Sequence, residues 1–525
     1  MTITDRHHPS NAAPHPARMS FNTPLAHSSA PPDWRWWAIL AVMFVLYGLT
    51  ANRGPQWQDS GHHIVRILTG EWINPGGLAL SHPLHHLLGR LAVAPGLLEP
   101  SLATTLISAL AAALAVANVY GCVRAWKHDR SAALVAALSL AFAHTFWQLA
   151  TLTETYTPAV ALLSAECWAL IAFLRTQRPS RLGLAIFFNG LGVSNHMQAA
   201  LSTPILIVVA GLTWRRRRAP SSQIMAWSGV WLLGASPYLL LVVTEAIRTG
   251  DVFAAAHSAL FGKTFAGAVL NVTPSWHQLL IVVGFLIYNF PNLSLPLAAY
   301  GATSRLKEPA DRAVRGVLLA YLLVHALFVA RYNIVDQHTF MLPTYTILAL
   351  FVGAGWARLS HLRDPRRARP LRFAAAVLLL ATPIVYMLTP PLARKWKILD
   401  GGLHEKPYRD DYVYLLSPWS LCERSAERMS KEALKLAGQG GVIIVEDPMA
   451  VYAVRYQLLR SGASNPLMDK KLNDDDLTAI RDTFASTQPV ILVPRNRNHP
   501  DTPPPIGSWR RAGDLYILEP AQNVP

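Results

Sequence analysis

Long apolar runs recur along the chain from residue 36 to residue 388, and they constrain the fold more than any other feature. Most of them approach the length, about 20 residues, that an α-helix needs to cross a hydrocarbon core of about 30 Å. Of the 525 residues, 52% are hydrophobic and only 15% are charged, which fits a soluble globular protein poorly. The sequence therefore predicts an α-helical polytopic membrane protein.

We predict about eleven transmembrane helices. The predicted spans lie near 36–51, 102–123, 132–149 and 158–174, as a tight pair around 194–197, near 225–243, in runs ending near 299 and at 331, and near 340–356 and 373–388. Between the first two spans the chain is weakly apolar and broken by Gly and Pro, so we expect it to lie on the membrane surface or dip into it.

The net charge of +16 does not indicate a nucleic acid partner, because of where the basic residues lie. They cluster in alternate short loops, whereas the loops holding Glu154 and Asn195 contain no Lys or Arg. By the positive-inside rule, the N-terminus is cytoplasmic. One outer face then carries the loops that hold Asp59, Glu154, Asn195, His196 and Asp336. We expect a multi-pass protein of a bacterial inner (plasma) membrane, surrounded by membrane lipids and binding no nucleic acid.

The two ends of the chain differ from the apolar middle, 34–389. Residues 1–33 are rich in Pro, His, Ala and Ser and predict a disordered cytoplasmic tail. Residues 390–525 predict a small soluble α/β domain on the periplasmic (extracytoplasmic) side. Its predicted elements are strands near 441–446, 489–493 and 515–518 and a helix near 426–436. No Gly-rich phosphate fingerprint opens a helix here, and the three cysteines give no disulfide framework or zinc pattern.

Four polar clusters share the predicted outer face. They are Asp59 with the histidines that follow it, Glu154, Asn195-His196, and Arg331 with Asp336. A carboxylate there can act as a general base or bind a divalent cation, and an arginine can hold a phosphate with two parallel hydrogen bonds. Simpler interpretations stay open: Glu154 as a solvated turn residue, Asn195 and His196 as links between helices, and Arg331 as a side chain reaching toward the membrane surface. The five histidines between 62 and 86 match no specific ligand spacing, so the metal ligands are unknown.

These clusters, in this order, resemble a family of multi-pass membrane proteins of formerly unknown function within the GT-C glycosyltransferase superfamily, a family that includes an animal protein O-mannosyltransferase. The stretches that carry the resemblance are Gln58-Asp59-Ser60-Gly61, Thr153-Glu154-Thr155-Tyr156, Gly190-Leu191-Gly192-Val193-Ser194-Asn195-His196, Tyr332-Asn333-Ile334-Val335-Asp336 leading into Phe340-Met341-Leu342-Pro343, and, as a weaker echo, 441–447 followed by Tyr452.

The chain departs from the family pattern at three places. His62 stands where the family has an acidic residue, and His82-Pro83-Leu84-His85-His86 replaces its His-Pro-Pro-Gly-Tyr run. Met197 replaces the second histidine of its Asn-His-His motif. These changes bear on the acceptor and on metal use, and they leave Asp59 in place.

The resemblance implies a GT-C-like membrane glycosyltransferase. It would transfer a sugar, with mannose among the candidates, from a polyprenyl-phosphate donor to a hydroxyl on a protein, glycan or lipid acceptor, with inversion. Asp59 would be the general base and Glu154 a second catalytic carboxylate. The remaining predicted substrate-binding residues are His62, Arg66, His82, Asn195, His196, Arg331 and Asp336.

The departing lipid phosphate needs a cation to stabilise it. Arg331 is our first choice, and Arg66 and Arg53, near Asp59, are the competitors. The alternative is a divalent cation, Mg or Mn, and no cofactor is predicted with certainty.

Two other classes of protein compete with the enzyme. A secondary transporter would place its ionisable residues near mid-membrane, whereas here they gather at the outer ends of the spans. A non-catalytic envelope-assembly protein would use the C-terminal domain to bind a partner.

Overall fold

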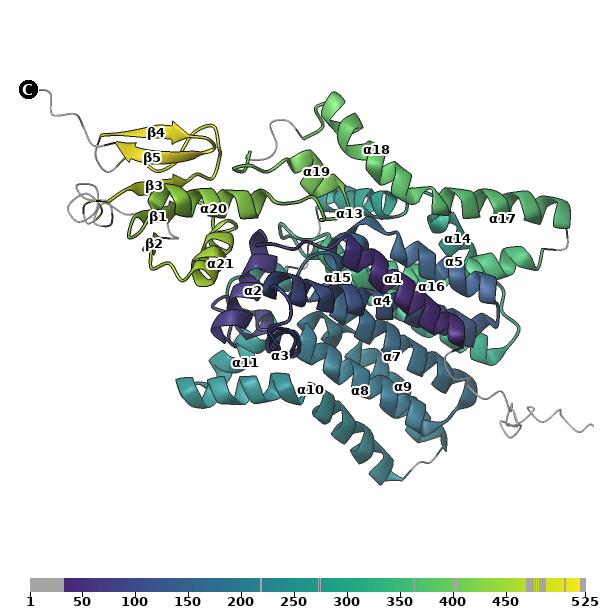
Figure 1. The fold of residues 1–525 in the computed structure, drawn as a ribbon. Helices are drawn as coiled ribbons and strands as arrows, with labels where there is room; N and C mark the ends of the chain where they lie inside the picture. Colours follow the sequence, from purple (N-terminus) through teal and green to yellow (C-terminus); the bar gives the residue numbers. More distant parts are fainter. Residues whose placement is uncertain are drawn as a thin grey trace, which may run out of the picture.

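The computed structural model of the chain describes residues 33–217, 220–271, 273, 275–362, 364–399, 405–468, 476, 478, 480, 488–504 and 507–519. They form a large helical body with a small α/β domain at one end (Figure 1). The predicted tail over 1–33 lies outside the described residues except for Asp33, which caps the first helix.

Helices make up the body from Trp34 to Lys395. In chain order they are α1 (Trp34–Leu49), α2 (Gln58–Thr69), η1 (Leu78–Leu80), α3 (Pro83–Val93), α4 (Pro100–Lys127), α5 (Arg130–Ala141), α6 (His144–Ala150), α7 (Tyr156–Thr176), α8 (Pro179–Asn195), η2 (Met197–Leu201), α9 (Thr203–Arg217), α10 (Ser221–Thr249), α11 (Val252–Phe261), α12 (Ala266–Leu270), α13 (Trp276–Asn289), α14 (Ser294–Ala302), α15 (Pro309–Arg331), η3 (Thr339–Met341), α16 (Leu342–Ser360), α17 (Pro365–Leu380) and α18 (Thr382–Lys395).

The prediction of a polytopic helical membrane protein is confirmed. Within the described residues, six helices are long and apolar enough to cross a membrane, and nine spans result if each of three bent helix pairs is one span. Helices also form at the two other predicted positions, but α1 has only 16 residues and α8 only 17. The count of eleven spans therefore stays a prediction.

The three bent pairs are α5–α6, α13–α14 and α17–α18, with bends of 70°, 107° and 51°. A break in a membrane helix frees backbone groups that no surrounding lipid can satisfy. Here Asn289, at the end of α13, accepts a hydrogen bond from the backbone N–H of Thr145 in α6 at 2.8 Å. Asn292 donates to the hydroxyl of Thr382, the first residue of α18, at 2.8 Å. Asn292 also accepts from the backbone N–H of Ser294, at the start of α14, at 2.8 Å. Asn289 and Asn292 thus satisfy backbone amides at two of the breaks and link the α13–α14 break to the start of α18.

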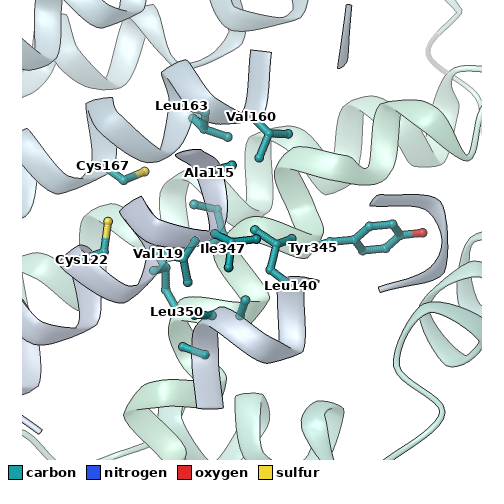
Figure 2. Close-up of a cluster of buried hydrophobic side chains, with 14 of the residues drawn as sticks. Ala115, Val119, Cys122, Leu140, Val160, Leu163, Cys167, Tyr345, Ile347 and Leu350 are labelled. Carbon is teal, nitrogen blue, oxygen red and sulfur yellow. The ribbon is translucent and has the colours of Figure 1, made fainter. Parts of the chain in front are cut away.

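The core of the body lies between α4, α5, α7 and α16. Figure 2 shows Ala115 and Val119 of α4 close to Ile347 of α16 and Leu140 of α5. Much of α4 is alanine and valine, and such small side chains let membrane helices approach closely. Cys122 and Cys167 are both buried beside this cluster and are unoxidised.

The C-terminal part contains a five-stranded sheet with strand order β2-β1-β3-β5-β4. Its elements are α19 (Asp411–Leu416), α20 (Ser425–Ala437), β1 (Val442–Val445), α21 (Val451–Ser461), β2 (Leu467–Met468), β3 (Val490–Val493), β4 (Ser508–Ala512) and β5 (Leu515–Glu519). Strands β2, β1 and β3 are parallel, while β5 and β4 are antiparallel additions. The small α/β domain is thus confirmed, including all three predicted strands.

The boundary between body and domain is less sharp than the sequence predicts. Helix α18 continues to Lys395, past the predicted boundary at 389. The division into 34–389 and 390–525 therefore stays a prediction.

Candidate active site

Asp59 lies in the first turn of α2, where the amide dipoles of a helix favour a negative charge. Its side chain is accessible to solvent although protein surrounds it on most sides. Burial, and then the nearby Asp336, raise the pKa of Asp59 to about 6. Because water still reaches the carboxylate, this shift reflects the surrounding protein rather than complete exclusion of solvent. At neutral pH Asp59 is an ionised, reachable base.

Glu154 lies in the loop between α6 and α7 and is buried. The Ser60 hydroxyl donates a hydrogen bond to its Oε1 at 2.5 Å, and Ser108 accepts from its backbone N–H at 3.0 Å. Burial raises the pKa of Glu154 to about 8; the Ser60 hydrogen bond opposes this, and Asp59 and Asp336 add to it. Near neutral pH Glu154 is therefore mostly protonated beside an ionised Asp59.

Asp336 belongs to the loop between α15 and η3 and is half-buried. Burial raises its pKa above the usual range. It is close enough to Asp59 and Glu154 to raise the pKa of both. We call Asp59, Glu154 and Asp336 the carboxylate cluster.

Side chains join the loops that carry this cluster. Gln56 accepts from the backbone N–H of Thr153 at 2.9 Å, which ties the start of α2 to the Glu154 loop. Asn195, at the end of α8, donates to the carbonyl of Thr155 at 2.8 Å. The structure thus brings the first three predicted clusters together, and Asp336 lies beside them.

Two of the predicted histidines, His82 and His196, pack against each other and against aromatic rings. The rings of His82 and His196 stack with centroids 4.8 Å apart, and His82 Nδ1 donates to the carbonyl of Asn195 at 2.9 Å. The His196 ring also packs 5.0 Å from Tyr156 and 5.6 Å from Phe340. Burial lowers the pKa of His196 to about 4 and that of His82 well below its usual range. Both imidazoles are neutral at pH 7 and can donate or accept hydrogen bonds.

His62 lies one turn after Asp59 on α2, and its ring stacks on Tyr452 of the C-terminal domain at 4.2 Å. Burial, and then the nearby Arg66 and Arg455, lower its pKa to about 4. His62 is therefore also neutral at pH 7.

Of the three candidate phosphate-binding arginines, Arg53 is exposed, and Arg66 and Arg331 both contact backbone carbonyls. Arg66 is 1% exposed and donates through Nε to Glu71 and through Nη2 to Trp72 and Ser81. Burial lowers its pKa to about 10, so it stays cationic. Arg331 is half-buried, and among the described residues its side chain donates hydrogen bonds from Nη1 alone, to the carbonyls of Val269 and Asn271 at 2.5 Å each.

A dedicated metal site does not fit these donors. Among the described residues, no group of three His, Cys, Asp or Glu side chains is arranged to hold a metal ion. The histidines instead contact one another and aromatic rings.

Several residues around the cluster carry no role in the sequence prediction. Ser60 lies inside the Asp59 motif and Tyr156 inside the Glu154 motif, so their proximity was available as a signal. Gln56 and Phe340 lie within four residues of Asp59 and Asp336, whereas Ser108, in α4, becomes a neighbour of Glu154 only through the packing of distant segments.

Comparison with known proteins agrees with this architecture. Residues 98–241 match the family of dolichyl-phosphate-mannose-protein mannosyltransferases. The structure resembles that of ArnT from Cupriavidus metallidurans bound to undecaprenyl phosphate, with a TM-score of 0.59 and 14% identity, over 93% of this chain and 98% of that one. It also resembles the same protein in its apo state, with a TM-score of 0.53 and 15% identity, over 87% of this chain and 92% of that one. No curated protein sequence matches the chain.

The fold and the matched segment together place the chain in the GT-C superfamily of membrane glycosyltransferases. The resemblance inferred from the sequence motifs is thereby confirmed at the level of the superfamily.

Proposed function

We propose that this chain transfers a sugar from a polyprenyl-phosphate donor to an acceptor hydroxyl on the outer face of the membrane, with inversion. The observation that carries the proposal is the solvent-accessible Asp59 carboxylate, held beside Glu154 and Asp336 where helix ends meet. The similarity to a protein bound to undecaprenyl phosphate supports a lipid-phosphate donor. Mannose is one candidate sugar, and the acceptor is a protein, glycan or lipid.

In the proposed reaction the acceptor oxygen attacks the anomeric carbon. The bond from that carbon to the phosphate oxygen breaks, and the acceptor proton passes to Asp59. The lipid phosphate leaves with the bonding electron pair. Asp59 suits this step because it is ionised at neutral pH yet has a pKa raised to about 6, which makes it a stronger base than an ordinary aspartate.

Glu154 has a different task in the proposal. A carboxyl group whose pKa is about 8 stays mostly neutral, so it places little negative charge beside Asp59. Through Ser60 it also holds the first turn of α2. Asn195 and the neutral His62, His82 and His196 would donate and accept hydrogen bonds around the sugar.

Arg331 remains the proposed contact for the donor phosphate. It is half-buried, whereas Arg66 is almost fully buried and already uses two of its nitrogens. A planar guanidinium suits a phosphate better than an ammonium does. Titration with a polyprenyl-phosphate analogue should show weaker binding for Arg331→Lys and weaker still for Arg331→Ala. Unchanged binding in Arg331→Ala, with a loss in Arg66→Ala, would move the phosphate site to α2.

Transport is the rival that the membrane interior could support, because Glu166 of α7 is buried within a span. Its Oε1 accepts from the Tyr321 hydroxyl, and its Oε2 accepts from Asn189 at 3.3 Å. Asn189 in turn accepts from Thr203 at 2.8 Å and from Trp231 at 3.0 Å. We call this set the Glu166 network. Since its members satisfy one another, it links helices and does not favour a transport pathway.

The decisive experiment uses purified protein in lipid nanodiscs with a labelled polyprenyl-phosphate sugar. We expect release of free polyprenyl phosphate that depends on an added acceptor. No release with any of a panel of donors, combined with uptake of a solute into proteoliposomes, would replace the transferase with a transporter. Absence of both activities would favour the non-catalytic assembly role.

The proposed sidedness has its own test. Reporter fusions should place residues near 216 and 366 in the cytoplasm and residues near 450 outside a bacterial inner membrane. A cytoplasmic signal at 450 would overturn the orientation and the side of the active site together.

A further inference from the structure

We propose that the C-terminal domain holds α2 in place and thereby positions Asp59, so that Tyr452 and Gln58 are positioning residues for the reaction. This inference rests on the proposed function only where it refers to catalysis. The hold on α2 itself is a property of the fold and can be measured separately.

The backbone at the start of α2 has an unusual conformation. Gln58 has a φ of +56°, in the left-handed region that residues other than glycine rarely adopt. Such a conformation persists only where its surroundings enforce it. The backbone N–H of Gln58 donates to the carbonyl of Met449 in the C-terminal domain at 2.9 Å. The residue directly before Asp59 is thus fixed by the other part of the molecule.

The turn that supplies this carbonyl is itself fixed. Asp447 accepts from the backbone N–H of Met449 at 3.0 Å, and its buried carboxylate is paired with Lys406. The Met449 carbonyl therefore presents a rigid acceptor to α2.

Helix α21 packs directly against α2, as Figure 1 shows. The Tyr452 ring stacks on His62 at 4.2 Å. A Cβ atom added at Gly61 would lie 3.2 Å from Cβ of Tyr452 and 2.3 Å from the carbonyl oxygen of Gln56. Glycine at position 61 is therefore required above all by the Gln56 carbonyl, and it also leaves room for the close approach of Tyr452.

A third contact fixes Trp57, the residue directly before Gln58. The indole N–H of Trp57 donates to the Ser425 hydroxyl at 2.8 Å, and Ser425 is the first residue of α20. Farther along, Ser420 donates from its backbone to the carbonyl of Thr50 at 2.9 Å. The C-terminal domain thus contacts the Asp59 loop from its beginning to the second turn of α2.

These contacts imply a specific dependence of the base on the domain. If Tyr452 is removed, α2 loses the ring that packs on Gly61 and His62, two and three residues after Asp59, and we expect more water to reach the carboxylate. The pKa of Asp59 would then fall from about 6 toward its ordinary value, because burial is the main cause of the rise. A purely structural role elsewhere in the domain would not change this titration.

The test compares Tyr452→Ala with Tyr452→Phe, which keeps the stacked ring, and with Leu459→Ala, an exposed position on α21. For Tyr452→Ala we expect faster amide hydrogen exchange in the α2 peptide, a kcat at least about tenfold lower, and an acid limb of the pH profile below 6. Tyr452→Phe keeps the stacked ring and should retain the exchange protection of α2, and Leu459→Ala should resemble the wild type in all three measurements.

Each outcome is decisive. Unchanged exchange in α2 for Tyr452→Ala would overturn the hold on α2, whatever the activity. Faster exchange with unchanged kcat and pH profile would overturn the positioning of Asp59. If the wild type shows no transfer at all, the proposed function fails, while the exchange measurement still tests the hold on α2.

If Tyr452→Ala does not fold, a second pair of variants, Gln58→Gly and Gln58→Val, tests the same inference. Gly at position 58 adopts a left-handed conformation without strain, whereas the β-branched Val cannot. Gln58→Gly should therefore keep the exchange protection of α2, and Gln58→Val should lose it. Equal protection in both variants would overturn the inference.

Discussion

The carboxylate cluster and the Glu166 network are two acidic sites in one helical body, and they differ in how their polar groups are satisfied. Both oxygens of Glu166 accept hydrogen bonds from side chains on neighbouring helices. In the cluster, Asp59 remains open to water. Burial raises the pKa of all three carboxyl groups, Asp336 raises that of Asp59 further, and both aspartates raise that of Glu154. Buried polar groups that satisfy one another stabilise a fold, whereas accessible groups with perturbed pKa values indicate chemistry.

Asp59→Asn is the most direct test of whether the carboxylate cluster carries chemistry. Loss of the general base should lower turnover about a hundredfold or more, while membrane insertion and donor binding are retained. Turnover from labelled donor and binding of a donor analogue would be measured on the same preparation. Near-normal turnover would remove Asp59 from the catalytic role.

Glu166→Leu tests the other half of the comparison. It leaves the Tyr321 hydroxyl buried without the Glu166 acceptor, which should cost about 1–3 kcal/mol of stability, whereas the Asn189 amide still donates to Ala199 and Ser202. Thermal unfolding in detergent would show the loss, with Glu166→Gln as a milder control that keeps an acceptor oxygen. A normal unfolding temperature combined with a lost turnover would give Glu166 a functional role instead.

Glu154→Gln tests whether Glu154 acts as a neutral carboxyl group. Because the pKa of Glu154 is about 8, its protonated form predominates at pH 7 and is lost as the pH rises through 8. We expect wild-type activity to fall on this basic limb, and Gln, which cannot ionise, to abolish the limb while lowering turnover at pH 7 by roughly tenfold or less. A basic limb that persists in the Gln variant would belong to another group.

The smallest expected effect is that of Asp336→Asn. The Asp336 charge raises the pKa of Asp59, so its removal should lower that pKa and move the acid limb of the pH profile below 6 by roughly one unit or less. A shift to higher pH would show that Asp336 does not act on Asp59 through its charge.

The sequence predicts the helical body and the β-strands well because both depend on local patterns. Apolar runs locate the helices, and the short apolar stretches near 442, 490 and 515 locate three strands. The strands β2 and β4 were missed: β2 has only two residues, and β4 contains Arg510 and Arg511, which break an apolar pattern. The three helix breaks were also missed, because Asn289 and Asn292 act on residues far away in sequence.

The candidate site, too, was predictable from the sequence only in part. The motifs predict which loops carry carboxylates and histidines, and the structure brings those loops together. The contacts of Tyr452 with His62 and of Met449 with Gln58 cross between the C-terminal domain and the body, and no pattern along the chain contains them. The carbonyl partners of Arg331 are likewise backbone groups 62 and 60 residues earlier, in α12 and directly after it.

The hydrogen bond between Asn289 and Thr145 has a consequence for biogenesis. The two residues are 144 positions apart, so the acceptor for the α6 amide is synthesised long after α5 and α6 have left the ribosome. At roughly 5–20 residues per second, the delay is on the order of ten seconds. During that time the break between α5 and α6 needs water or lipid headgroups to satisfy its amide. The third span must therefore wait near a hydrated environment, in the translocation channel or at the bilayer surface, until α13 arrives and its break can be packed.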